Sequence, residues 1–322
     1  MINYFTDGSY GDVVSFIGIM AAFFLTCFFM VKCSSLLPKD AGRAYAHDGK
    51  LSAGKPRGAG FIFVLVFIGA GFLFAEMTRE NIIYIVLVAA AMMTGFLDDC
   101  AKTPWGEYKK GLLDLIIAVM VAVTFLNFNT NEIYLVIPNQ TIVIPPVIFG
   151  ILTVILVWVS INVTNCSDGV DGLSGTLTII TLLTVYVIDR LSDADAGFGY
   201  LLLIFVTCIL GYLWFNATPS ILMMGDAGSR AMGLFIAIAV LKTGSPFLYL
   251  LAALVLILDG GLGLIKVALL RFLKIKILAN TRTPLHDHVR KVWNWSNTQA
   301  VYRFAIIQIV ASIAAVYLYI LR

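Results

Sequence analysis

Three polar clusters in this sequence combine residue types that can hold metal ions and phosphate groups. In the first, Asp98 and Asp99 are adjacent, and Lys102 follows within one helical turn. Neighbouring carboxylates either bind a divalent cation or raise the pKa of one partner. The alternative is a solvated helix end beside a basic loop, although Asp is disfavoured at a helix C-terminus.

The second cluster is Asn162-Val-Thr-Asn165-Cys-Ser-Asp168-Gly-Val-Asp171-Gly, between two apolar runs. Asn, Asp and Gly at this density predict a tight turn whose oxygen atoms face one point. Asp171 alone could cap the following helix. Capping does not account for the second Asp and the two Asn residues, so we interpret this turn as functional.

The third cluster is Gly225-Asp226-Ala-Gly228-Ser229-Arg230. Its glycines let the backbone come close to a ligand, and the N-terminus of the following helix offers free N–H groups to a phosphate. Alternatively, Asp226 or Ser229 is simply an N-cap.

Two loops add basic residues and imidazoles. The segment Pro284-Leu285-His286-Asp287-His288 holds two of the three histidines. Zinc is one possible ligand, but thiol partners are missing and acidic oxygens dominate elsewhere, so a pyrophosphate-binding and sugar-binding loop is favoured. Lys55 and Arg57 stand between glycines, a pattern that suits either an anionic ligand or a cytoplasmic loop.

These clusters together favour Mg²⁺, because carboxylate and amide oxygens are hard ligands. A magnesium ion with a basic rim suits a diphosphate substrate. If the clusters share one membrane face, the site can take a soluble nucleotide from one side and a lipid phosphate from the other.

The rest of the chain must position these clusters in a membrane. Of its 322 residues 60% are hydrophobic and 13% charged, with a mean hydropathy of +0.93, whereas a soluble domain is about 25% charged. This composition excludes a soluble enzyme, a secreted disulfide scaffold and a disordered chain. The net charge of +3 does not suggest nucleic acid as a partner. We predict an all-α integral membrane protein forming a single polytopic domain over 1–322.

Ten transmembrane helices are predicted from runs of about 20 apolar residues. They lie near 13–37, 59–76, 81–97, 111–128, 146–163, 172–190, 198–215, 230–243, 246–270 and 301–321. Two β-rich runs around Pro138-Asn139, within 132–145, predict a short hairpin on the periplasmic face.

The orientation follows from the basic residues. Numbered from the first span, the odd loops hold 15 Lys and Arg residues and the even loops three. Basic residues favour the cytoplasm, which places both termini outside. The polar clusters then lie on the cytoplasmic loops 38–58, 98–110, 163–171, 216–230 and 271–300. A cation-coupled transporter is the alternative from another class, but it would place its charges near the bilayer midplane and show a repeat between halves.

The ordered motifs Asp98-Asp99, Asn165-x-x-Asp168-Gly-x-Asp171, Gly225-Asp226-x-Gly228-Ser229 and Pro284-Leu285-His286-Asp287-His288 resemble those of the polyprenyl-phosphate N-acetylhexosamine-1-phosphate transferases. Within this family the chain is most similar to the members that use UDP-MurNAc-pentapeptide. The resemblance implies Mg²⁺-dependent transfer of phospho-MurNAc-pentapeptide to undecaprenyl phosphate, giving lipid I and UMP. Related enzymes that use UDP-GlcNAc are the alternative.

The resemblance also implies residue roles and a location. Asp98, Asp99, Asp226 and His286 would be catalytic, and Asp226 and Asp99 would hold Mg²⁺. The substrate-binding residues would be Lys102, Asn162, Asn165, Asp168, Asp171, Asn216, Met223 and His288. The enzyme would lie in the bacterial plasma membrane, in contact with membrane lipids, and two copies could form a homodimer.

Four positions depart from the family pattern. Asp287 stands between the two histidines where the family usually has a third, and Arg290 replaces an acidic residue. Met223 stands where an aromatic residue that stacks on uracil is expected. The usual Thr/Gly-rich segment before the second span reads Lys55-Pro56-Arg57.

Overall fold

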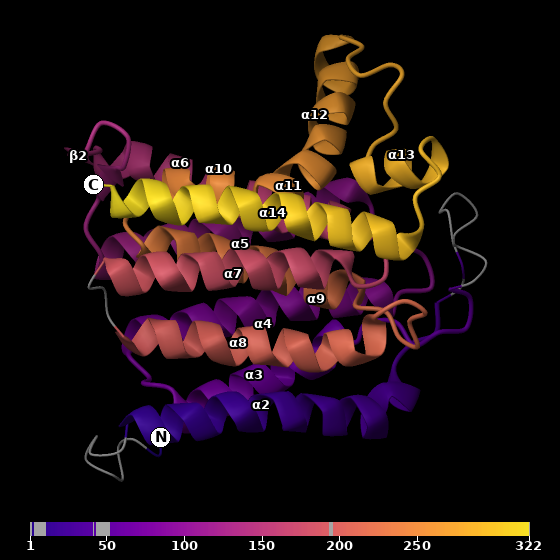
Figure 1. The fold of residues 1–322 in the computed structure, drawn as a ribbon, viewed down its shortest axis with the longest axis horizontal. Coiled ribbons are helices and arrows are strands. Elements are labelled where there is room, and N and C mark those ends of the chain that lie inside the picture. The colour runs from indigo at the N-terminus through magenta and orange to yellow at the C-terminus, as the bar shows by residue number, and fades with distance from the viewer. Residues whose placement is uncertain (1, 3–10, 41, 43–51, 193–195, 322) are drawn as a thin grey trace.

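The computed structural model describes residues 2, 11–40, 42, 52–192 and 196–321. Most of these residues are helical, and the long helices run side by side through the molecule (Figure 1). Seven helical segments within this part of the chain are long and apolar enough to cross a membrane. They are α2 with the short η1 (Gly11–Leu36), α4 (Arg79–Asp99), α5 (Glu107–Phe128), α6 (Pro146–Cys166), α7 (Leu173–Leu191), the Phe198–Asn216 part of α8 (Ala196–Asn216) and α14 (Asn297–Ile320).

A broken helix adds an eighth segment. Pro246–Ala252 and Leu254–Leu273 meet at an angle of 74°. The first arm contains η2 (Pro246–Leu248) and α10 (Tyr249–Ala252). The second contains α11 (Leu254–Leu256), the π-helical turn η3 (Ile257–Gly261), α12 (Leu262–Ala268) and the π-helical turn η4 (Leu269–Leu273). Figure 1 shows α12 projecting away from the other helices.

Two further helices coincide with predicted spans but are less apolar or shorter. Helix α3 (Gly60–Phe74) has 15 residues, and α9 (Gly225–Lys242) has 18 residues and carries Asp226, Arg230 and Lys242. Each predicted span therefore falls on helical structure, while the total of ten crossings remains a prediction.

Helix α9 forms the centre of the bundle, because every residue from Gly225 to Leu241 is buried. It packs against α3, α4, α6 and α7. Small residues make this packing close: a Cβ at Gly233 would lie 2.6 Å from the carbonyl oxygen of Ser160, and one at Gly60 would overlap the backbone of Gly228. The sequence of α9 is rich in Gly and Ala, which lets four helices approach its backbone.

A two-stranded sheet forms where the sequence predicts it. Strands β1 (Glu132–Leu135) and β2 (Gln140–Val143) are antiparallel, with Glu132 opposite Val143. Asn139 has a φ of 50°, a conformation that Asn tolerates better than most residues. The sheet region and both chain ends lie on the left in Figure 1, opposite the end that carries α13 (Leu285–Lys291). The hairpin's position outside the cell remains a prediction.

Candidate active site

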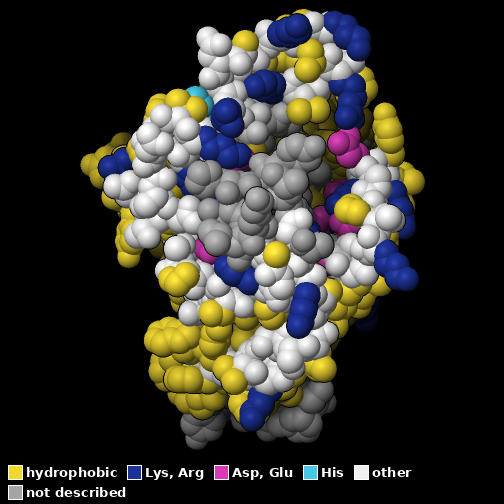
Figure 2. All heavy atoms as spheres, turned by 90° about the vertical axis from the view of Figure 1, so that its right-hand side faces the viewer, with side chains coloured by type: hydrophobic (Ala, Val, Ile, Leu, Met, Phe, Trp, Pro, Cys, Tyr) yellow, Lys and Arg dark blue, Asp and Glu magenta, His cyan; other side chains and the backbone are white. Residues whose placement is uncertain are grey.

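An open cavity of about 260 Å³ lies where the polar loops converge. Its lining includes six residues that the sequence nominates: Asn165, Asp168, Asp171, Asn216, Met223 and Asp226. Arg57 and Lys110 line it as well. Figure 2 looks onto this end of the bundle and shows many Lys and Arg side chains there, with acidic side chains between them. Residues 41 and 43–51 of the predicted site loop 38–58 lie outside the described residues.

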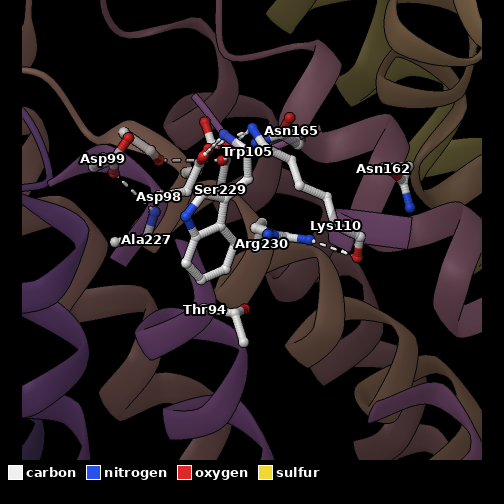
Figure 3. A network of polar contacts seen from close by, with 12 residues as sticks. Thr94, Asp98, Asp99, Trp105, Lys110, Asn162, Asn165, Ala227, Ser229 and Arg230 are labelled. Atoms are coloured by element: carbon white, nitrogen blue, oxygen red, sulfur yellow. Dashed lines mark hydrogen bonds and ion pairs between the residues drawn. The ribbon is translucent and has the colours of Figure 1, made fainter. Parts of the chain in front are cut away.

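Lys110 connects two of the predicted catalytic acids. Its Nζ forms an ion pair with Asp98 and lies 3.0 Å from Oδ2 of Asp226. Arg57 makes a parallel connection, with Nε 2.9 Å from Oδ1 of Asp99 and Nη2 3.5 Å from Oδ1 of Asp226. Asp98 and Asp99 at the end of α4 therefore meet Asp226 at the start of α9 through two cations. Figure 3 shows Asp98, Asp99 and Lys110 within this network of polar contacts.

Backbone donors hold the two adjacent carboxylates in place. Asp98 accepts a hydrogen bond of 2.6 Å from the backbone N–H of Trp105, and Asp99 accepts one of 3.3 Å from that of Ala227. Gly225 has a φ of 72°, and a Cβ there would overlap Oδ2 of Asp99. The glycine before Asp226 is therefore required by the approach of α9 to the end of α4.

The loop that contains Arg57 is anchored to the segment before α9. Met223 N–H donates to the Pro56 carbonyl at 2.8 Å, and Ala59 N–H donates to the Met223 carbonyl at 3.0 Å. Burial acts to lower the pKa of Arg57, but the carboxylates of Asp99 and Asp226 raise it overall. Arg57 therefore stays cationic in the cavity.

The Asn- and Asp-rich turn joins the same region from another side. Asn165 donates to the Ser229 hydroxyl at 2.9 Å, and Asp171 accepts from the Ser220 N–H at 3.2 Å. Lys55 donates to the hydroxyl of Ser220 at 3.0 Å. Three loops that are far apart in the sequence thus form one wall of the cavity.

Asn216 lines the cavity but also has a structural function. Its Oδ1 accepts from the Gly172 N–H at 2.8 Å, and its Nδ2 donates to the Leu222 carbonyl at 2.9 Å. Both ends of the amide are therefore used to connect the end of α8 to neighbouring turns.

Three of the predicted substrate-binding residues lie outside the cavity lining. Lys102 is exposed. Asn162 donates to Asp114 at 3.4 Å and to the Trp158 carbonyl at 2.8 Å. His288 accepts from the Arg282 N–H at 3.2 Å through Nδ1, and its ring contacts Trp293.

Lys110, rather than Lys102, contacts the acids because α4 does not continue past Asp99. The chain turns after Cys100, and Lys110 returns on the first turn of α5. In the sequence Lys102 is the lysine nearest to the carboxylates, within one helical turn, and the family resemblance gave it a substrate-binding role. A signal for Lys110 was its place at the start of the next apolar run, on the same predicted loop.

His286 is buried beside the cavity and pairs with Asp259, which was not predicted from the sequence as a site residue. Its Nδ1 lies 2.8 Å from Oδ2 of Asp259, and its backbone N–H donates to Oδ1 at 2.7 Å. Asp259 lies inside the predicted span 246–270. A carboxylate within an apolar run is a signal that could have identified it.

Two of the departures from the family pattern contact each other. Arg290 Nη2 lies 2.8 Å from Oδ1 of Asp287, and Lys291 Nζ lies 3.0 Å from its Oδ2. Asp287 and Arg290, at positions where the resemblance leads one to expect a histidine and an acidic residue, thus form a local ion pair. Arg290 also donates to the Gly169 carbonyl at 3.3 Å, which ties α13 to the cavity wall.

The charges at the centre of the cavity suit a divalent cation held with substrate. No group of three or more His, Cys, Asp or Glu within the described ranges converges as a complete metal site. Magnesium ions are usually held by one or two carboxylates, with phosphate oxygens and water as the other ligands. Asp40, Asp98, Asp99 and Asp226 place four carboxylates around the cations Arg57 and Lys110. The donor set therefore fits Mg²⁺ bound together with a diphosphate.

Comparisons with known proteins identify relatives of this chain. The sequence model of glycosyl transferase family 4 matches residues 81–244. A phospho-N-acetylmuramoyl-pentapeptide-transferase of Treponema pallidum is 42% identical over 311 residues, which cover 91% of this chain and 85% of that protein. Proteins of the same name from Wolbachia pipientis wMel and Nitratiruptor sp. are 27% and 25% identical, and cover 75% and 98% of this chain and 77% and 98% of their own lengths.

The matches to the Treponema pallidum and Nitratiruptor proteins cover 91% and 98% of this chain. Together with the apolar helices, they identify a multi-pass bacterial membrane enzyme. The chain belongs to glycosyl transferase family 4 and, within it, to the phospho-N-acetylmuramoyl-pentapeptide transferases.

Proposed function

We propose that this enzyme transfers phospho-MurNAc-pentapeptide from UDP-MurNAc-pentapeptide to undecaprenyl phosphate. The observation that carries the proposal is the meeting of Asp98, Asp99 and Asp226 with Lys110 and Arg57 beside an open cavity. Carboxylates, cations and room for a soluble nucleotide are what such a reaction requires. The names of the relatives support the same reaction.

The reaction exchanges one phosphoanhydride for another. An oxygen of the lipid phosphate bonds to the phosphorus attached to the sugar, the bond from that phosphorus to the UMP oxygen breaks, and UMP leaves. Asp98 or Asp99 takes the proton of the lipid phosphate if it is protonated. Lys110 and Arg57 stabilise the negative charge on the non-bridging oxygens.

We assign the remaining residues by their place around the cavity. Asn165, Asp168, Asp171 and Met223 line the part that would hold the nucleotide sugar. Asp226 and Asp99 would hold Mg²⁺, which neutralises diphosphate charge when bound.

We further propose that the cavity faces the cytoplasm of a bacterial cell, with ten spans and both termini and the hairpin outside. The distribution of 15 basic residues against three supports this orientation. In a cysteine-free variant, a cysteine replacing Asn139 should react with an impermeant thiol reagent in intact cells, and one replacing Asn280 should not. The opposite labelling would reverse the topology.

The reaction is tested by measuring UMP release from UDP-MurNAc-pentapeptide with undecaprenyl phosphate, using UDP-GlcNAc as the comparator. Release from the first substrate alone is expected. Release only from UDP-GlcNAc would show that the enzyme makes the other lipid-linked sugar.

Asp226→Asn tests the metal assignment. An amide is a poor substitute for an ionised oxygen ligand, so nearly all UMP release should be lost, with a small recovery at high Mg²⁺. Asp189→Asn is the matched control, because Asp189 is also buried but lies in the last turn of α7, far along the helix from the cavity. If Asp226 were only an N-cap, Asn would replace it with little loss, and normal turnover would reject the metal assignment.

A further inference from the structure

Asp259 and His286 form an isolated buried pair at the edge of the cavity. Asp259 is fully buried and His286 is 3% exposed. Asp259 lies in the π-helical turn η3, and His286 in the first turn of α13. Both oxygens of Asp259 are used on one residue: Oδ1 accepts from the His286 backbone N–H at 2.7 Å, and Oδ2 lies 2.8 Å from Nδ1 of the ring.

This arrangement determines which ring nitrogen carries the proton. A carboxylate has no hydrogen to donate, so Nδ1 must be the protonated nitrogen in the contact with Oδ2. Nε2 of the neutral ring then has a free lone pair. The hydrogen bond made by one nitrogen thereby sets the state of the other.

The second nitrogen faces the cavity wall. His286 Nε2 is the nearest atom to the position that a Cβ at Gly169 would occupy, and the two would overlap. Gly169 lines the cavity together with Asp168 and Asp171. Arg290 holds the same glycine through its carbonyl at 3.3 Å. The hydrogen bonds of His286 within the described part of the chain use its backbone and Nδ1. Nε2 is not among the fully buried atoms that lack a partner, so it remains accessible to a ligand.

We propose that Asp259 is a positioning residue, which fixes His286 in the Nδ1–H tautomer and directs Nε2 to a phosphate group in the cavity. Nε2 accepts a proton there, or donates one to a phosphate oxygen once the ring is protonated. The carboxylate of Asp259 stabilises the imidazolium form in the second case. This inference rests on the proposed function for the identity of the phosphate group.

Asp259→Asn should move the ring proton of His286 from Nδ1 to Nε2, while the shape of the side chain at position 259 hardly changes. The amide oxygen must face the backbone N–H of His286, because an NH₂ group there would place two donors together. The NH₂ group therefore faces Nδ1, which must give up its hydrogen, and the proton moves to Nε2. General acid–base contributions are about 10²- to 10⁴-fold. We expect kcat for UMP release to fall by about 10²-fold or more, and KM for the nucleotide sugar to change much less.

Gln308 provides a matched control for local damage. It is also fully buried, and it stabilises the break of the same helix by accepting from the Val255 N–H at 2.8 Å. Gln308→Leu should lower thermal stability without changing the tautomer of His286. Asp259→Glu keeps the charge and should recover part of the kcat lost in the Asn variant.

The tautomer itself is read from nitrogen-15 spectra of the histidine rings at alkaline pH. The chain has three histidines, and the signal of His286 is assigned by its loss in His286→Gln. The wild type should carry the proton on Nδ1 and Asp259→Asn on Nε2. A wild-type proton on Nε2, or an Asn variant with unchanged kcat, would overturn the inference.

The spectra need no substrate, so they separate this inference from the proposed reaction. A wild-type enzyme that releases no UMP would contradict the proposed function while the tautomer result stands. An active wild type with the wrong tautomer would contradict only the role of Asp259.

Discussion

The guanidinium of Arg230 lies 2.6 Å from the carboxylate of Asp114, and both side chains are buried. This pair joins α9 to α5 one helical turn from Lys110, whose carbonyl accepts a second hydrogen bond from Arg230 at 3.2 Å. Nη1 of Arg230 is buried without a hydrogen bond. The contact therefore supports the lysine that connects Asp98 to Asp226.

Asp114→Ala should strongly destabilise the protein, because it leaves the Arg230 charge buried without its partner. Loss of one member of a buried pair costs about 3–5 kcal/mol. Glu107→Ala is the matched control, since its pair with Arg271 is exposed on both sides and solvent screening leaves such a pair little stabilising effect. Unfolding of the purified protein in detergent measures both. Equal losses of stability in the two variants would show that the buried Asp114–Arg230 pair stabilises the protein no more than the exposed pair does.

Lys110→Ala should reduce UMP release by about 10²- to 10³-fold, the usual effect of removing one donor that stabilises transition-state charge. Lys102→Ala should leave turnover close to wild type, because Lys102 is exposed and outside the cavity. Steady-state assays of the two variants at saturating Mg²⁺ make the comparison. A large loss of turnover in Lys102→Ala with normal turnover in Lys110→Ala would contradict the assignment of Lys110 to the site.

Gly225→Ala should abolish activity as well as reduce stability. A side chain at positive φ costs roughly 1–2 kcal/mol, and the new Cβ would also displace Asp99. Gly244 has a similar φ of 68° but open space around it. Gly244→Ala should therefore lose stability alone, which thermal unfolding and UMP release measured together will show. Full activity in Gly225→Ala would mean that the approach of Asp99 to α9 is unimportant.

The stability contributed by Asp287 should depend on pH. Burial acts to raise the pKa of Asp287, but the hydrogen bond from Lys291 and the charges of His286, Lys291 and Arg290 lower it overall from the usual 3.8. A depressed pKa stabilises the fold above the usual value, and this stabilisation is lost as the pH falls through the folded-state value. Asp287→Asn should therefore melt below wild type at neutral pH, and the two melting temperatures should converge as the pH falls below the usual pKa of 3.8.

Glu132→Gln is the control for this experiment, because it removes one acidic charge from the exposed start of β1. Its melting temperature should follow the wild type across the pH range. A constant difference between Asp287→Asn and wild type at all pH values would refute the ion-pair explanation.

The sequence predicted most elements of the site because its signals are local. Polar residues at the ends of apolar runs are costly to place near the membrane, so their presence there indicates a function. This signal applies to Asp98, Asp99, Asn165, Asp168, Asp171 and Asp226. Their convergence on one cavity could be expected once all three clusters were placed on the same membrane face. The hairpin strands around Asn139 were predictable for a similar reason, because turn and strand preferences act over a few residues.

The features that were missed depend on contacts between distant residues. The break between Ala252 and Leu254 has no proline or glycine at its centre, and Gln308, 53 residues beyond Val255, satisfies the backbone there. Asp259 is likewise explained only by His286, 27 residues later. The positions of Lys110 and Lys102 are distinguished by the turn after α4, which residue spacing alone does not reveal.

The burial of α9 from Gly225 to Leu241 has a consequence for motion. Its amide hydrogens can exchange with solvent only when the surrounding helices separate, and such openings require free energies close to that of global unfolding. Asp226 lies in the first turn of this helix. Its backbone is therefore held by the part of the protein that we expect to open most slowly. We expect exchange in α9 to be the slowest in the chain and to follow the same temperature dependence as unfolding. Adaptation to different substrates must then come from the loops around Asp226, while its own position stays fixed until the whole bundle opens.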